Sequence, residues 1–125
     1  MHTPVLFKET FDFLKIQKGE TVVDATADGG GHLEEILERV GKNGVVVAID
    51  QDDTMIDHLK KRFENEIYDG RLKIKCGNFR EIEEILESLS VSEVDAVLFD
   101  LGMSSAHFEK SGRGFSFLKQ YFLLY

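Results

Sequence analysis

The sequence is poor in the residues and segments that mark secreted or membrane proteins. It has one cysteine, one proline and no tryptophan in 125 residues. The single Cys76 cannot form a disulfide within the chain, so we expect a reducing, intracellular location and an ordinary strand position for Cys76. No segment resembles a signal peptide, and no apolar run approaches the roughly 20 residues that span a bilayer. These absences favour a cytoplasmic protein without a membrane segment.

Basic residues are also scarce relative to acidic ones. The chain has 15 Lys and Arg against 23 Asp and Glu, which gives a net charge of -8. An acidic overall field disfavours binding of a polyanion, so any contact with nucleic acid must be local or be made by a part that this sequence lacks. Apolar residues make up 42% of the chain, which suffices for one hydrophobic core without disulfides.

Strand patterns and helix patterns alternate along the chain. The expected strands are Thr21–Thr26, Val45–Asp50, Leu72–Cys76 and Asp95–Asp100, and the expected helices cover roughly Leu6–Leu14, Leu33–Val40, Met55–Ile67 and Phe79–Leu89. Such alternation predicts an α/β fold in which helices flank a parallel sheet of about four strands, joined by right-handed crossovers.

A glycine-rich loop follows the first expected strand, in the stretch Asp24-Ala25-Thr26-Ala27-Asp28-Gly29-Gly30-Gly31-His32. Glycines at such a junction permit positive φ angles and a close approach of the backbone to a ligand. Asp50 ends the second strand about 20 residues later, the spacing at which a carboxylate accepts the hydroxyls of an adenosine ribose. The alternative for Asp50 is a helix cap, a role open also to Asp52 and Asp53. Asp24 either accepts bonds from the loop amides or forms a plain Asx turn.

The register of the glycines indicates the class of ligand. Counted from Gly29 or Gly31, the third glycine of a G-x-G-x-x-G fingerprint is replaced by Glu34 or Ile36, so the dinucleotide motif is absent. The acidic Asp28 would also repel a pyrophosphate. An adenosine ligand with a positive centre, S-adenosylmethionine, therefore fits better than a nicotinamide dinucleotide. The four histidines lack the spacing of metal ligands, and no metal is expected.

Six motifs occur in an order that resembles one known family. They are Thr3-Pro4-Val5-Leu6 with Glu9, the Asp24-to-His32 stretch, Ala48-Ile49-Asp50-Gln51-Asp52, Gly77-Asn78-Phe79, Asp100-Leu101-Gly102-Met103-Ser104-Ser105, and Arg113-Gly114-Phe115-Ser116-Phe117. From Thr3 to Phe117 the chain resembles the bacterial ribosomal RNA small-subunit methyltransferase H family. That family uses S-adenosylmethionine to methylate the N4 of a cytosine in small-subunit ribosomal RNA. The resemblance implies a Rossmann-like class I methyltransferase core, this cofactor and this RNA partner.

The resemblance also assigns a role to each site residue. It implies that the methionine end of the cofactor lies against Gly30, Gly31 and His32, that Asp50 holds the ribose, and that Phe79 lies against the adenine. Taken without it, His32 is a first helical residue with a local hydrogen bond, and Phe79 is an ordinary core residue.

Two further residues are assigned near the reacting atoms. Asp100 is implied as a cofactor contact and as the catalytic acceptor for the hydrogens of the target amino group. The alternative for Asp100 is a turn-forming residue. His107 stands where the family typically has a glutamine that contacts the cofactor, and Asp28 stands where it usually has a glycine.

The sequence departs most from the family after Phe117. A P-L-D-M-R-M type segment is expected there, but residues 118–125 form an apolar tail. We therefore expect a truncated S-adenosylmethionine-binding domain over residues 1–117, an atypical tail over 118–125, and no helical substrate domain. Because Lys110, Arg113 and Lys119 are the only cations near this end, they are candidate phosphate contacts, with a solvated surface as the plainer interpretation.

Truncation makes methyl transfer by this chain doubtful and leaves two alternatives. One is a non-catalytic remnant that forms a homodimer through its apolar tail and at most binds S-adenosylmethionine. The other is a small-molecule methyltransferase with a similar glycine loop.

Overall fold

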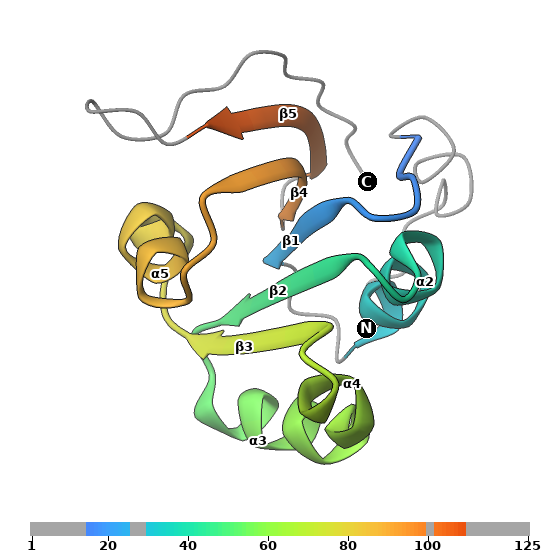
Figure 1. Ribbon diagram of the computed structural model, residues 1–125. Helices are drawn as coiled ribbons and strands as arrows, with labels where there is room; N and C mark the ends of the chain where they lie inside the picture. Colours follow the sequence, from blue (N-terminus) through green and yellow to red (C-terminus); the bar gives the residue numbers. More distant parts are fainter. Residues whose placement is uncertain (1–14, 26–29, 100–101, 110–125) are drawn as a thin grey trace.

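A computed structural model describes residues 15–25, 30–99 and 102–109 of the chain. These residues form one five-stranded sheet with helices on both faces (Figure 1). The strands are β1 (Thr21–Ala25), β2 (Val45–Asp50), β3 (Leu72–Cys76), β4 (Glu93–Phe99) and β5 (Gly102–Glu109). The helices are α2 (Gly31–Val40), α3 (Asp53–Arg62), α4 (Glu64–Tyr68), the short 3-10 helix η1 (Phe79–Glu81) and α5 (Ile82–Ser88).

The strand order is β3-β2-β1-β4-β5, and the first four strands in sequence are parallel. This confirms the predicted parallel α/β core. Val22 of β1 pairs with Val46 of β2 on one side and with Ala96 of β4 on the other. The strand order therefore reverses at β1, which is where open α/β sheets bind their ligands.

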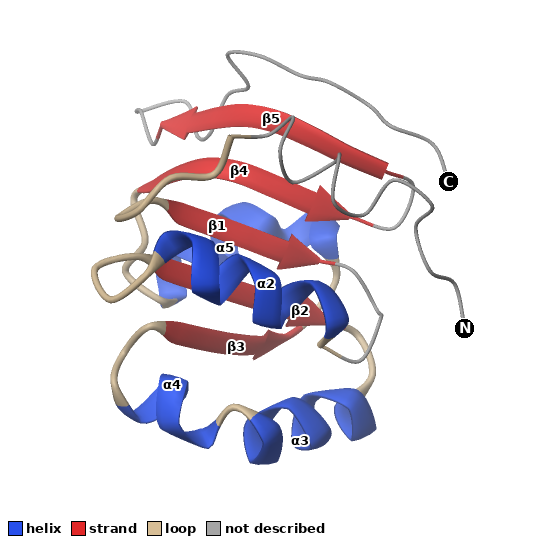
Figure 2. Ribbon diagram, turned by 90° about the vertical axis from the view of Figure 1, so that its right-hand side faces the viewer, coloured by secondary structure: helices blue, strands red, loops and turns tan. Residues whose placement is uncertain are grey.

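Successive residues of the central strands enter opposite cores, so both faces of the sheet are buried. Val22 and Val46 pack with α2 in one cluster, while Val23 and Val47 pack with α5 in the other. Figure 1 shows α2 and α5 on opposite sides of the sheet, and Figure 2 shows α3 and α4 beyond the β3 edge. Burial on both faces explains why these strands are continuous apolar runs without polar alternation.

The fifth strand was not predicted. β5 pairs antiparallel with β4, with Phe99 opposite Gly102 and Glu93 opposite Glu109, over a segment for which no strand or helix was expected. Its first half, Gly102-Met103-Ser104-Ser105, has a glycine and two consecutive serines, and only residues 105–109 alternate between polar and apolar, so the strand signal is short. Pairing with the backbone of β4, a non-local interaction, fixes this conformation instead.

Two predicted helices are each divided in the structure. The expected helix Met55–Ile67 is interrupted at Phe63, which has φ -112° and ψ 32° and is buried in the core with only 5% of its surface exposed. The expected helix Phe79–Leu89 begins instead with η1, and α5 follows it. By contrast, α2 ends as predicted, because Gly41 N donates to Leu37 O at 3.1 Å.

Some expectations fall on other parts of the chain. The expected helix Leu6–Leu14 and the tail 118–125, through which the non-catalytic alternative would form a homodimer, lie outside the described residues. In the part that is described, no helix is long and apolar enough to cross a bilayer.

Candidate functional site

The carboxyl ends of the parallel strands bring two predicted carboxylates to one edge of the sheet. Asp24 is the penultimate residue of β1 and Asp50 is the last residue of β2. Both side chains are buried, with 4% and 8% of their surface exposed. Buried carboxylates are uncommon unless another group compensates them, so this edge is the candidate ligand site.

Asp50 has one engaged and one unengaged oxygen. Its Oδ1 accepts a hydrogen bond from Asp52 N at 2.8 Å. Its Oδ2 is buried and accepts no hydrogen bond from any residue described. The cap of α3 is Asp52, whose side chain accepts from Thr54 N at 2.8 Å, so Asp50 is not the helix cap that the alternative interpretation required. An unsatisfied buried acceptor costs about 1–3 kcal/mol, which a ligand hydroxyl could recover.

The start of α2 carries three predicted contacts. Gly30 caps the helix with φ 98°, as a glycine loop predicts, and Gly31 and His32 form its first turn. His32 is buried with 5% of its surface exposed. A Cβ on Gly30 would lie 3.0 Å from Phe63 Cε2 and 3.1 Å from Leu59 Cδ2. Close packing against α3 therefore requires a glycine at position 30 whether or not a ligand contacts it, and nothing in the local sequence indicates this.

Phe79 lies three residues after Cys76, the last residue of β3 and the partner of Asp50 in the sheet. Gly77 N donates to Asp50 O at 2.9 Å, which extends the β2–β3 pairing by one residue toward Phe79. Phe79 begins η1, is half-buried, and packs against the core cluster on the α5 face. Part of the Phe79 side chain is thus a core residue, as the alternative interpretation states. The contact with adenine remains a prediction for the exposed part of the ring.

Cys76 shows that this edge is electrostatically negative. It ends β3 opposite Asp50, is exposed, and its thiol lies 3.0 Å from Asp53 Oδ1. The hydrogen bond to Asp53, together with the negative charges of Asp53, Asp50 and Asp52, raises the pKa of the Cys76 thiol. The same charges would favour a ligand that carries a cation.

The remaining predicted residues are placed only in part. Asp100 follows the last residue of β4 and lies outside the described residues, as do Lys110, Arg113 and Lys119. His107 lies on β5 as far as the backbone is described. Within ranges 15–25, 30–99 and 102–109, no three His, Cys, Asp or Glu side chains are grouped to hold a metal ion.

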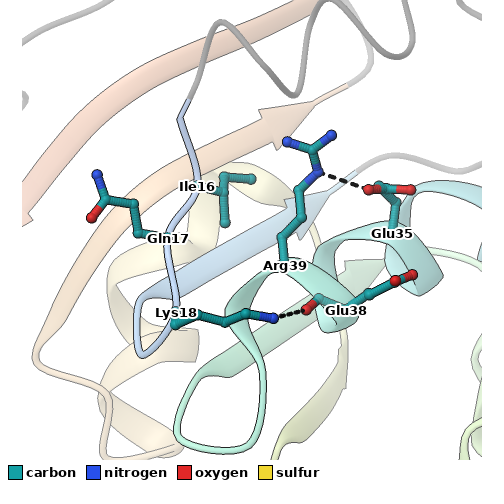
Figure 3. Close-up of a pocket in the computed structure, with 6 residues that line it drawn as sticks. All are labelled: Ile16, Gln17, Lys18, Glu35, Glu38 and Arg39. Atoms are coloured by element: carbon teal, nitrogen blue, oxygen red, sulfur yellow. Dashed lines mark hydrogen bonds and ion pairs between the residues drawn. The ribbon is translucent and has the colours of Figure 1, made fainter.

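A separate depression lies away from this edge. Its volume is about 610 Å³, and it is bounded by α2 and the turn before β1 (Figure 3). Its charged groups are bonded within the depression: Lys18 Nζ donates to Glu38 O at 2.8 Å, and Arg39 pairs with Glu35 at 2.7 Å. It contains none of the predicted site residues, so we assign the site to the carboxyl edge.

Solved structures share this fold. An O-methyltransferase from Bacillus cereus in complex with S-adenosylhomocysteine has a TM-score of 0.63 and 16% identity, and the match covers 80% of this chain and 46% of that chain. Fibrillarin from Aeropyrum pernix with natively bound S-adenosylmethionine has a TM-score of 0.58 and 15% identity, over 68% of this chain and 35% of that chain. The fold is therefore the Rossmann-like fold of S-adenosylmethionine-dependent methyltransferases.

Sequence comparisons give the family. The chain is 41% identical over 119 residues to the ribosomal RNA small subunit methyltransferase H of Halothermothrix orenii, a match that covers 95% of this chain and 37% of that protein. The chain thus spans well under half the length of this curated relative. The model of the MraW methylase family matches residues 1–123, a range that extends past Phe117. The chain belongs to the MraW methylase family.

Proposed function

We propose that this chain forms the cofactor-binding part of an S-adenosylmethionine-dependent methyltransferase that acts on small-subunit ribosomal RNA. Membership of a methylase family and the name of the 41% identical relative support this activity. The finer proposal, methylation of cytosine N4, rests on the motifs that resemble the small-subunit methyltransferase H family. The observation that carries the cofactor site is the unengaged, buried Oδ2 of Asp50 at the carboxyl edge.

The chemistry of Asp50 fits a ribose. Vicinal hydroxyls offer two donors, and a carboxylate offers two acceptor oxygens. Because Oδ1 already accepts from Asp52 N, Oδ2 is the oxygen with its full capacity left for a hydroxyl. Phe79, two residues after the Gly77 amide that bonds Asp50 O, would then contact the adenine on the neighbouring strand end.

The other end of the site would hold the methionine part. Gly30 is the N-cap of α2, and Gly31 and His32 begin its first turn. The helix N-terminus favours a carboxylate, and the buried Asp24 and Asp50 favour a positive centre between them. S-adenosylmethionine carries both groups, and when bound it supplies an electrophilic methyl group.

The proposed role of Asp100 follows from the weakness of the nucleophile. The lone pair of cytosine N4 is delocalised into the ring, so N4 attacks poorly unless its hydrogens are bonded to an acceptor. Asp100 follows β4, and its carboxylate would accept a hydrogen bond from the amino group, localise the lone pair and orient N4 for in-line attack. His107 on β5 would add a contact to the cofactor.

Calorimetry with S-adenosylhomocysteine tests the cofactor site. Asp50→Asn retains an amide oxygen for Asp52 N but loses the charge and one acceptor. Hydrogen bonds to charged groups contribute about 1.5–3 kcal/mol, so we expect roughly 10- to 100-fold weaker binding. Asp57→Asn on the exposed face of α3 makes the same charge change and should bind as the wild type does. Absence of binding to the wild type, or equal binding by Asp50→Asn, would contradict the proposed site.

The acceptor is tested by transfer of a labelled methyl group to small-subunit ribosomal RNA from cells that lack the modification. We expect the label in N4-methylcytidine after hydrolysis to nucleosides. Label in another nucleoside, or in a metabolite panel alone, would refute the cytosine proposal. Binding of S-adenosylhomocysteine without any transfer would favour the non-catalytic alternative for this chain.

A further inference from the structure

Side-chain hydrogen bonds join the two loops that leave the sheet beside the proposed site. Gln51 follows β2 and Asn78 follows β3, and Asn78 Nδ2 donates to Gln51 Oε1 at 3.3 Å. A second contact between the same segments joins the thiol of Cys76, two residues before Asn78, to Asp53 Oδ1 at 3.0 Å. We call the contact between Gln51 and Asn78 the loop bridge. The backbone pairing of β2 with β3 ends before these two residues. The loop bridge therefore holds the two loops together where the sheet no longer does.

Asn78 also forms hydrogen bonds to η1, the 3-10 helix that begins with Phe79. Its Oδ1 accepts from Arg80 N at 2.9 Å, while its own backbone N donates to Glu81 Oε1 at 3.2 Å. This is a capping box, which fixes the direction in which η1 leaves the strand. The same amide side chain therefore holds Gln51 with its nitrogen and the start of η1 with its oxygen.

We infer that Gln51 is a positioning residue for the adenosine part of the cofactor, acting through Asn78 on Phe79. This inference rests on the proposed function. Each end of the loop bridge is adjacent in sequence to a proposed contact, since Gln51 follows Asp50 and Asn78 precedes Phe79. A ribose and its adenine have a restricted mutual geometry, so they bind well only where the two protein contacts are held at a matching separation.

The exposure of the bridge separates this role from a role in folding. Gln51 is exposed and Asn78 is half-buried, their hydrogen bond is accessible to solvent, and neither residue belongs to a core cluster. Loss of a solvent-exposed hydrogen bond between neutral groups changes the stability of a fold little. If the loop is less ordered in the free protein, ligand binding must order it at a cost in conformational entropy. We expect this cost to weaken binding about three- to tenfold.

A double-mutant cycle tests the inference by calorimetry with S-adenosylhomocysteine. Gln51→Met removes the acceptor at similar size, and Phe79→Leu removes the aromatic face while it retains apolar packing. We expect Gln51→Met to weaken binding in the wild-type background and to have no further effect beside Phe79→Leu. Gln51→Glu keeps an acceptor oxygen and should bind within about twofold of the wild type. Gln17→Met, an exposed change away from the site, is the matched control and should be neutral.

The outcomes separate this inference from the proposed function. Equal weakening by Gln51→Met in both backgrounds would mean that Gln51 acts independently of Phe79 and would overturn the inference. So would unchanged binding by Gln51→Met, or binding by Gln51→Glu as weak as that by Gln51→Met. If the wild type fails to bind or Asp50→Asn has no effect, the proposed cofactor site itself fails.

Discussion

Replacing Gly30 with alanine should destabilise the protein through two separable effects. The φ of 98° at this helix cap is unfavourable for an L-residue by about 1–2 kcal/mol. The added Cβ would also lie 3.0 Å from Phe63 Cε2 and 3.1 Å from Leu59 Cδ2, and both of those side chains are 5% exposed. Buried groups have little room to move, and overpacking typically costs about 1–3 kcal/mol. We expect a total loss of about 2–5 kcal/mol in the free energy of unfolding.

A second glycine isolates the packing effect. Gly70 has φ 78°, but a Cβ there would meet nothing within 4 Å. Gly70→Ala should therefore lose only the conformational part, and urea unfolding followed by circular dichroism measures both variants. The difference between Gly30→Ala and Gly70→Ala should be about 1–3 kcal/mol. Equal losses in the two variants would refute the claim that Gly30 is required by its contact with α3.

Two further predictions concern single side chains. Arg71 Nη2 donates to Leu37 O at 2.7 Å and Arg71 Nε donates to Gly41 O at 3.1 Å, so Arg71 bonds the carbonyl groups at the end of α2. Arg71→Met should therefore lower the free energy of unfolding by about 1.5–3 kcal/mol in urea titrations. An unchanged midpoint would show that the last carbonyls of α2 do not need this partner. The raised pKa of the Cys76 thiol should make its alkylation by iodoacetamide slow near neutral pH, because little thiolate is present. Asp53→Asn removes the main cause and should lower that pKa and speed alkylation; equal rates would contradict this origin.

The parallel core was predictable because each of its central strands is a continuous apolar stretch of the sequence. Strands buried on both faces are continuous apolar runs, and the first five residues of β2, VVVAI, meet that requirement without help from distant residues. The end of α2 was predictable for the same reason, since Gly41 marks it locally. β5 and the interruption at Phe63 were not predictable, because pairing with β4 and burial in a distant core determine them.

The candidate site also contains residues that the sequence could identify and residues that it could not. Asp50 could be proposed from the sequence because strand length and a fixed topology bring the end of β2 to the carboxyl edge of the sheet whatever the loops do. The loop bridge joins two side-chain amides that lie 27 residues apart, and in the sequence each resembles any solvated loop residue. Sequence spacing can therefore identify functional groups whose place is set by the strands of the sheet. Residues that adjust the distance between such groups lie on loops, where only the folded arrangement shows which polar side chains meet.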